Sequence, residues 1–107
     1  MTDLPVWDLD WLLQGSVNYP DLQESDRRMT IALTCFLQEH GLLKRTMLKP
    51  GEDPPRDFII RHSDLTPEGR VFHMSGAVDR WLRANDDVRK PLSMRSLERS
   101  LKKIRSD

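Results

Sequence analysis

The side chains that could carry out chemistry in this chain are few and scattered. The three histidines, His40, His62 and His73, show no metal-ligand spacing, and the single cysteine, Cys35, lies in an apolar stretch where a small core residue is expected. The sequence contains no GxSxG, P-loop or GxGxxG motif, the commonest signatures of hydrolases and nucleotide-binding proteins. We therefore expect no enzyme, no bound metal and no cofactor.

Carboxylates and tryptophans gather near the N-terminus. Residues 1–40 carry seven acidic and two basic side chains, a net charge of −5, and residues 41–107 carry +5 because the chain is neutral. Segregated charge steers a partner of opposite sign, and tryptophan is enriched at binding hot spots. These features predict a surface for a protein partner made of Trp7, Asp8, Asp10, Trp11, Asp21 and Glu24. The alternative is that the tryptophans pack against the central helix.

A second set of side chains could contact DNA. Arginine and glutamine make bidentate contacts to guanine and adenine, and threonine contacts the thymine methyl. A polar stripe with these types runs along one predicted helix, and nearby basic residues could hold phosphates: Arg27, Thr30, Thr34 and Gln38, then Lys44 and Arg45. The neutral overall charge counts against nucleic acid, because affinity comes from neutralising phosphates. The alternative is a solvated helix face, or one covered by the N-terminal helix.

Four helices and a two-stranded ribbon are expected to position these residues. Capping residues and apolar spacing predict helices over residues 4–14 (N-cap Asp3), 26–40 (N-cap Ser25, with Gly41 at C′), 67–85 and 94–105. Two β-prone segments, 42–48 and 57–62, predict a ribbon whose loop is rich in proline and glycine. The helix over 26–40 should form the centre of the core. The fold class is therefore mainly α with a small two-stranded β ribbon, in a single domain over residues 1–107.

The composition predicts a soluble globular protein of a reducing compartment. Hydrophobic residues make up 37% of the chain, enough for one modest core. One cysteine cannot form an intramolecular disulfide, no apolar run approaches the ~20 residues that cross a bilayer, and the acidic start is unlike a secretory signal. We expect a bacterial cytoplasmic protein without membrane contact.

Two short phrases lie between residues 33 and 70: a helix end followed by GLL-x-R, and LT-x-x-G at the start of the next helix. Their residues are Gly41, Leu42, Leu43, Arg45, Leu65, Thr66 and Gly69. In these phrases the stretch resembles winged-helix regulators of the MarR-like and PadR-like kinds, in which the first phrase leads into the wing. The resemblance implies a winged-helix-like fold and a DNA-binding regulator, dimeric through its terminal helices. The chain departs from this pattern in two ways. DNA-reading members need a helix, a tight turn and a recognition helix, but the Pro-interrupted segment between Gln14 and Asp26 is too short for a full helix-turn-helix. In addition, Glu52 and Asp53 at the loop tip would repel phosphate.

The C-terminal phrase SLERSLKKIR is similar in style to the ends of small bacterial immunity proteins. Such proteins neutralise a toxin by covering its active site, and an acidic N-terminal surface would suit a basic toxin domain. The function predicted from the sequence is a non-enzymatic protein-binding module that acts by stoichiometric association. The alternative is a winged-helix DNA-binding regulator.

Overall fold

The longest helix, α2 (Pro20–Glu39), lies at the centre of the fold. Pro20 begins it, because proline at the first helical position has no N–H that would be left unpaired. The helix ends in a Schellman motif, in which Gly41 has a φ of 69° and the Leu42 N–H donates to the Leu37 carbonyl at 2.8 Å. Gly41 is confirmed at the predicted C′ position. The predicted start at Asp26 is wrong, because the turn begun at Pro20 continues without a break.

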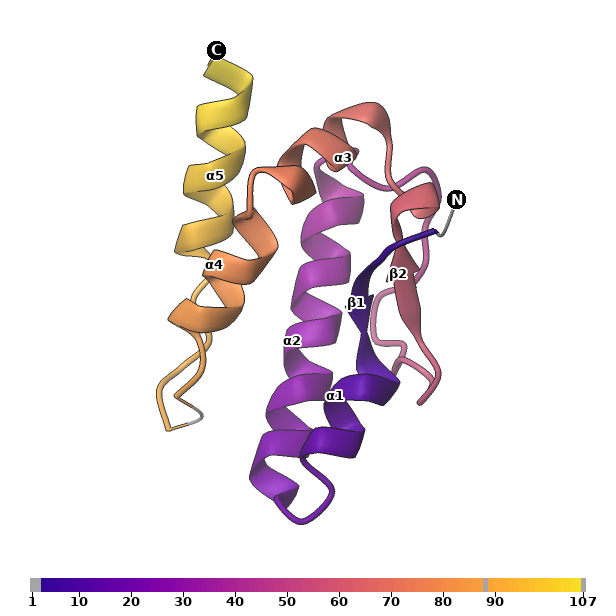
Figure 1. Cartoon of the computed structure of the whole chain (residues 1–107), viewed down its shortest axis with the longest axis vertical. Helices are drawn as coiled ribbons and strands as arrows, with labels where there is room; N and C mark the ends of the chain where they lie inside the picture. Colours follow the sequence, from indigo (N-terminus) through magenta and orange to yellow (C-terminus); the bar gives the residue numbers. More distant parts are fainter. Residues whose placement is uncertain (1–2, 88, 107) are drawn as a thin grey trace.

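The other elements surround α2. The computed structural model describes residues 3–87 and 89–106, and these residues form five α-helices, one 3₁₀ turn and one two-stranded antiparallel sheet. The further elements are β1 (Pro5–Asp8), α1 (Leu9–Gly15), β2 (Ile59–Arg61), η1 (His62–Asp64), α3 (Pro67–Met74), α4 (Ala77–Ala84) and α5 (Arg95–Ser106). In Figure 1, α2 lies between the β1–β2 sheet on one side and α4 with α5 on the other. The predicted class, mainly helical with a small sheet, is confirmed.

The N-terminal segment is a strand followed by a short helix. The predicted helix over 4–14 with Asp3 as its N-cap is wrong, because residues 5–8 pair with β2 and the helix starts only at Leu9. Asp8 is the N-cap, and its carboxylate accepts the Trp11 N–H at 3.2 Å. Asp3 instead accepts hydrogen bonds from Ser63. Both aspartates suit a helix cap, and the pairing of β1 with a distant strand decides between them.

The partner of β2 differs from the predicted one. The segment 42–48 forms no strand; it has an isolated bridge between Leu43 and Leu65, whereas β2 pairs with β1 through Trp7 and Ile60. The side chain of Gln38 takes the place of a strand partner, because its carbonyl oxygen accepts the N–H groups of Met47 and Leu48 at 2.6 and 2.8 Å. The predicted ribbon of 42–48 with 57–62 is therefore wrong, although a two-stranded sheet exists.

The predicted helix over 67–85 is two helices. Gly76 has a φ of 83°, a left-handed conformation that a side chain disfavours, and it separates α3 from α4. Thr66 caps α3, and its hydroxyl accepts the Gly69 N–H at 3.1 Å. The last helix, α5, agrees with the predicted 94–105 to within one residue at each end.

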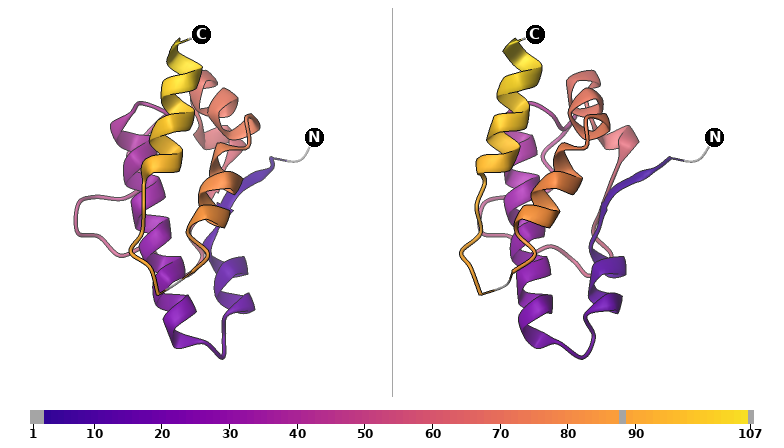
Figure 2. Two further views of the ribbon diagram at one scale, coloured as in Figure 1. Left: turned by 90° about the vertical axis from the view of Figure 1, so that its left-hand side faces the viewer. Right: turned by 60° about the vertical axis from the view of Figure 1, so that its left-hand side comes forward.

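The core lies where α2 meets the sheet, α3, α4 and α5. Trp81, Phe72, Leu33, Ile60 and Leu97 are all fully buried, so every layer contributes at least one large apolar side chain. The two further views in Figure 2 show α5 alongside the upper part of α2, with α3 and α4 next to α5. Among the described residues, no helix combines the length and apolar character that a membrane crossing requires.

Candidate protein-binding surface

Trp11 is the most conspicuous side chain on the N-terminal side of the molecule, with 70% of its surface exposed. It projects from α1, whose apolar positions Leu9 and Leu13 are buried against the core. The position of Trp11 on the short helix is fixed by the Asp8 cap, which holds the Trp11 backbone N–H. An indole has a large apolar ring and a polar N–H, and side chains of this kind are enriched at binding interfaces.

Two cavities flank Trp11. The first, about 310 Å³, lies between β1 and α4 and is called here the β1–α4 groove; its residues are Pro5, Val6, Trp7, Asp8, Trp11, Leu12, Val78, Asp79 and Leu82. The second, about 470 Å³, is the α1–α2 groove; it is lined by Trp11, Leu12, Gln14, Gly15, Ser16, Leu22 and Asp26. Trp11 and Leu12 line both grooves. The exposed residues Val17 and Tyr19 follow in the connection to α2. Trp11 and the residues of the two grooves are called the Trp11 surface.

The charged side chains that line these two grooves are all acidic. Asp8 and Asp79 line the β1–α4 groove, and Asp26 lines the α1–α2 groove. Partial burial raises the pKa of Asp26, and the Ser16 hydroxyl, which donates to it at 2.9 Å, partly offsets that shift. Asp10 lies beside Trp11 in α1 and pairs with Arg56 at 3.3 Å. The Trp11 surface therefore offers a partner an aromatic group with carboxylates close by.

Three of the predicted partner-binding residues differ from Trp11: Trp7 lines the β1–α4 groove but is buried, and Asp21 and Glu24 lie outside both grooves. Trp7 is 4% exposed; its indole N–H donates to the Thr30 hydroxyl at 2.8 Å and its ring lies 5.8 Å from that of Trp81. The predicted exposed contact at Trp7 is thus wrong, and the alternative, packing on the central helix, is what the structure contains. Asp21 and Glu24 are exposed on α2 but line neither groove, and Glu24 pairs with Arg28 at 3.7 Å.

The residues predicted to contact DNA do not form an exposed stripe. Thr30 and Thr34 are completely buried, and the side-chain amide of Gln38 is hydrogen-bonded to the backbone of Met47 and Leu48. A stripe of α2 that contacts bases through these threonines is therefore wrong, because both are buried, Trp7 of β1 donates to Thr30, and the segment 47–48 is bonded to Gln38. The remaining members are exposed: Arg27, Lys44, and Arg45, which pairs with Asp64 at 3.2 Å.

The fold brings together two histidines that the sequence keeps eleven residues apart. The Nε2 atom of His62, in η1, lies 2.9 Å from the Nδ1 atom of His73, in α3. Burial lowers the pKa of His73, the neighbouring His62 lowers it further, and Asp79 partly raises it. Only tertiary structure creates this pair, so no spacing rule reveals it. The described residues contain no group of three or more His, Cys, Asp and Glu side chains suited to a metal ion.

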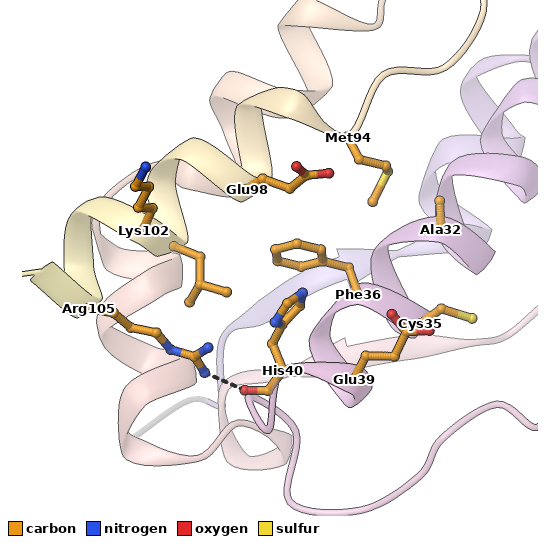
Figure 3. Close-up of a pocket in the computed structure, with 10 residues that line it drawn as sticks. Ala32, Cys35, Phe36, Glu39, His40, Met94, Glu98, Lys102 and Arg105 are labelled. Carbon is orange, nitrogen blue, oxygen red and sulfur yellow. Dashed lines mark hydrogen bonds between the residues drawn. The ribbon is translucent and has the colours of Figure 1, made fainter.

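A third cavity, about 610 Å³, lies between α2 and α5. Figure 3 shows the ring of His40 beside that of Phe36, with centroids 4.5 Å apart, and the guanidinium of Arg105 donating to the His40 carbonyl at 2.6 Å. Cys35 is half-buried at this groove and not in the core. Arg105 also pairs with Glu68 at 2.8 Å, and that hydrogen bond lowers the pKa of Glu68. These contacts fasten α5 to the ends of α2 and α3.

Comparisons of the chain with protein-family models, with curated proteins and with solved structures gave no match.

Proposed function

We propose that this chain is a non-enzymatic protein-binding module that forms a stoichiometric complex through the Trp11 surface. The observation that carries the proposal is Trp11 itself, an indole that is 70% exposed between two cavities on a helix anchored in the core. Tryptophans held by a rigid frame are the side chains that most often dominate binding energy, because they bury a large area with little loss of side-chain freedom.

The chemistry of the surroundings indicates what kind of partner fits. Asp8, Asp79 and Asp26 line the grooves beside the indole, and Asp10 adjoins it in α1. Carboxylates around an apolar anchor favour a partner whose own rim is basic, and they speed the encounter with it. A basic toxin domain, neutralised by one-to-one binding, is the partner class whose charge suits this surface. The one cysteine is a free thiol, which suits a reducing cytoplasm.

The experiment is a capture assay with paired variants. Immobilised wild-type protein, Trp11→Ala and Met74→Ala are exposed to the same cell extract. Met74 is a matched control, because it is 77% exposed and apolar but lies on α3, outside both grooves. We expect a partner that is retained by the wild type and by Met74→Ala and is lost with Trp11→Ala.

The purified partner then allows the stoichiometry of the complex and the loss of affinity in Trp11→Ala to be measured. Light scattering should show a one-to-one complex, and calorimetry should show that Trp11→Ala weakens it by about 30-fold or more, corresponding to about 2 kcal/mol. The thermal unfolding of Trp11→Ala should match that of the wild type, because the side chain contributes little to the core. Equal affinity for the Trp11→Ala and Met74→Ala proteins would refute the proposal.

A further inference from the structure

The strand β1 has an edge that no other strand occupies. The sheet consists of β1 and β2 alone among the described residues, so each strand is paired on one edge only. In Figure 1, β2 lies on one side of β1, and the helices α2 and α4 lie on the other. An unpaired strand edge carries a row of N–H and C=O groups that can accept a further strand.

The unpaired side of β1 opens onto the β1–α4 groove. All four residues of β1 line this groove, and its opposite wall is made by Val78, Asp79 and Leu82 of α4. Trp11 lies at the α1 end. The four residues of β1 extend about 13 Å, at about 3.3 Å per residue, so the groove matches a short extended segment. Pro5 lacks an N–H, and the N–H of Trp7 faces β2, as does that of Leu9, which donates to the Phe58 carbonyl at 3.1 Å. The donors on the unpaired edge therefore come from the neighbouring residues Val6 and Asp8.

The β1–α4 groove is lined mainly by apolar side chains, and the charged side chains that line it are carboxylates. Val6, Val78 and Leu82 supply apolar surface, while Asp8 and Asp79 are the charged side chains that line it. An extended segment alternates its side chains, so apolar ones would face the groove interior while basic ones reach the carboxylates. A second copy of this chain suits the groove poorly, because its own β1 would bring Asp8 against the same two carboxylates.

We propose that the unpaired edge of β1 binds an extended, basic peptide segment of the partner as a third strand, seated in the β1–α4 groove. This inference rests on the proposed function and specifies how the partner is held. Main-chain hydrogen bonds to the backbone groups of Val6 and Asp8 that face away from β2 supply affinity, and the carboxylates of Asp8 and Asp79 select lysine or arginine on the segment. Trp11 covers the end of the added strand.

A synthetic probe tests the binding mode without the natural partner. The full chain, labelled with ¹⁵N, is titrated with the peptide acetyl-Lys-Val-Thr-Val-Lys-Val-amide. We expect the amide signals of Val6 and Leu82 to shift, with a dissociation constant on the order of 1 mM. Successive residues of an added strand point their N–H groups alternately at the protein and at solvent. N-methylation at one position should therefore weaken binding about tenfold, and at the next position should leave it unchanged.

A pair of charge variants tests the carboxylates. Asp79→Lys should weaken binding of the probe severalfold, because one of the two attracting charges is reversed. For the same reason the affinity should depend less strongly on salt concentration. Asp53→Lys is the matched control, since it makes the same charge change in an exposed loop outside the groove. Equal weakening by both variants would refute the role of Asp79.

The outcomes separate the strand-addition proposal from the protein-binding function. No shift at Val6 up to several millimolar probe, or equal effects of N-methylation at neighbouring positions, would overturn strand addition. Shifts at Val6 that follow protein concentration without peptide would assign the edge to a second copy and overturn it too. The capture assay with Trp11→Ala is independent of the probe, so a partner lost with Trp11→Ala would leave the protein-binding function standing when strand addition fails.

Discussion

Trp7 and Trp11 lie four residues apart, yet they have opposite environments. Trp7 belongs to β1 and donates its indole N–H to the Thr30 hydroxyl inside the protein, whereas Trp11 projects from α1 into solvent. The change from strand to helix between them turns one indole inward and the other outward. Their types and spacing alone place both on one helix face, so the sequence indicates a tryptophan contact but cannot say which residue makes it.

The buried Trp7–Thr30 hydrogen bond should contribute measurably to stability. Thr30→Val keeps the shape of the side chain but leaves the Trp7 indole N–H without an acceptor, and we expect the free energy of unfolding to fall by about 1–3 kcal/mol. Thr34→Val is the control, because the Thr34 hydroxyl only donates to the Thr30 carbonyl, at 2.7 Å, so no buried donor loses its partner. Urea denaturation of both variants measures the difference. Equal losses would contradict this account.

The His62–His73 pair should make stability depend on pH in a defined window. The folded protein holds the pKa of His73 below its ordinary value of 6.5, so the unfolded chain binds more protons as the pH falls through that value. The free energy of unfolding is therefore unaffected by His73 above pH 6.5, and it declines as the pH falls from 6.5 toward the pKa of His73 in the folded protein. His73→Gln should remove that part of the decline.

Urea midpoints at pH 7.5 and pH 5.5 for the wild type and His73→Gln provide the measurement. The carboxyl groups whose pKa is lowered, those of Asp3, Glu68 and Asp87, respond at more acidic pH and stay outside this window. A decline of the same size in both proteins would show that His73 is not its source.

Helices α2 and α5 illustrate what the sequence can predict at the level of elements. Their apolar spacing and the Gly41 stop are local signals, and both helices and the stop are present. The strand β1 was not predicted, because its partner is more than fifty residues away and strand pairing leaves no local signature. Likewise, the β1–α4 groove could not be found before the fold was known, because its second wall comes from α4, about seventy residues after β1 and α1.

Gly69 fixes how α3 packs against the chain leaving α2. A Cβ atom at this position would collide with the backbone carbonyl of Leu42, and that carbonyl is held by the Thr66 N–H at 2.9 Å. We expect Gly69→Ala to lower the free energy of unfolding by about 1–3 kcal/mol, although alanine favours helices. Gly15→Ala is the control, because open space surrounds a Cβ at that position. Thermal unfolding compares the two. A neutral Gly69→Ala would show that the two segments do not approach closely.

Taken as a whole, the molecule combines an acidic N-terminal third with a basic remainder, and the fold joins the two. Ion pairs such as Asp10–Arg56 link the halves, while the carboxylates of the two grooves remain grouped around Trp11. The segregation of charge and the placing of Asp8 and Asp10 near Trp11 were visible in the sequence. The addition of Asp79 to this group was not, because Asp79 reaches the groove from α4. This arrangement, rather than any reactive cluster, is what the proposed function rests on.

The three tryptophans allow a direct test of that claim. Trp7 and Trp81 donate their indole N–H groups inside the protein, to Thr30 and to the Ser93 carbonyl, whereas Trp11 is exposed. The measurement is the ¹H–¹⁵N spectrum of the three indole groups with and without the captured partner. The account predicts that the Trp11 signal shifts and becomes protected from solvent exchange while the other two stay unchanged. A saturated complex in which the Trp11 signal is unaltered would contradict it.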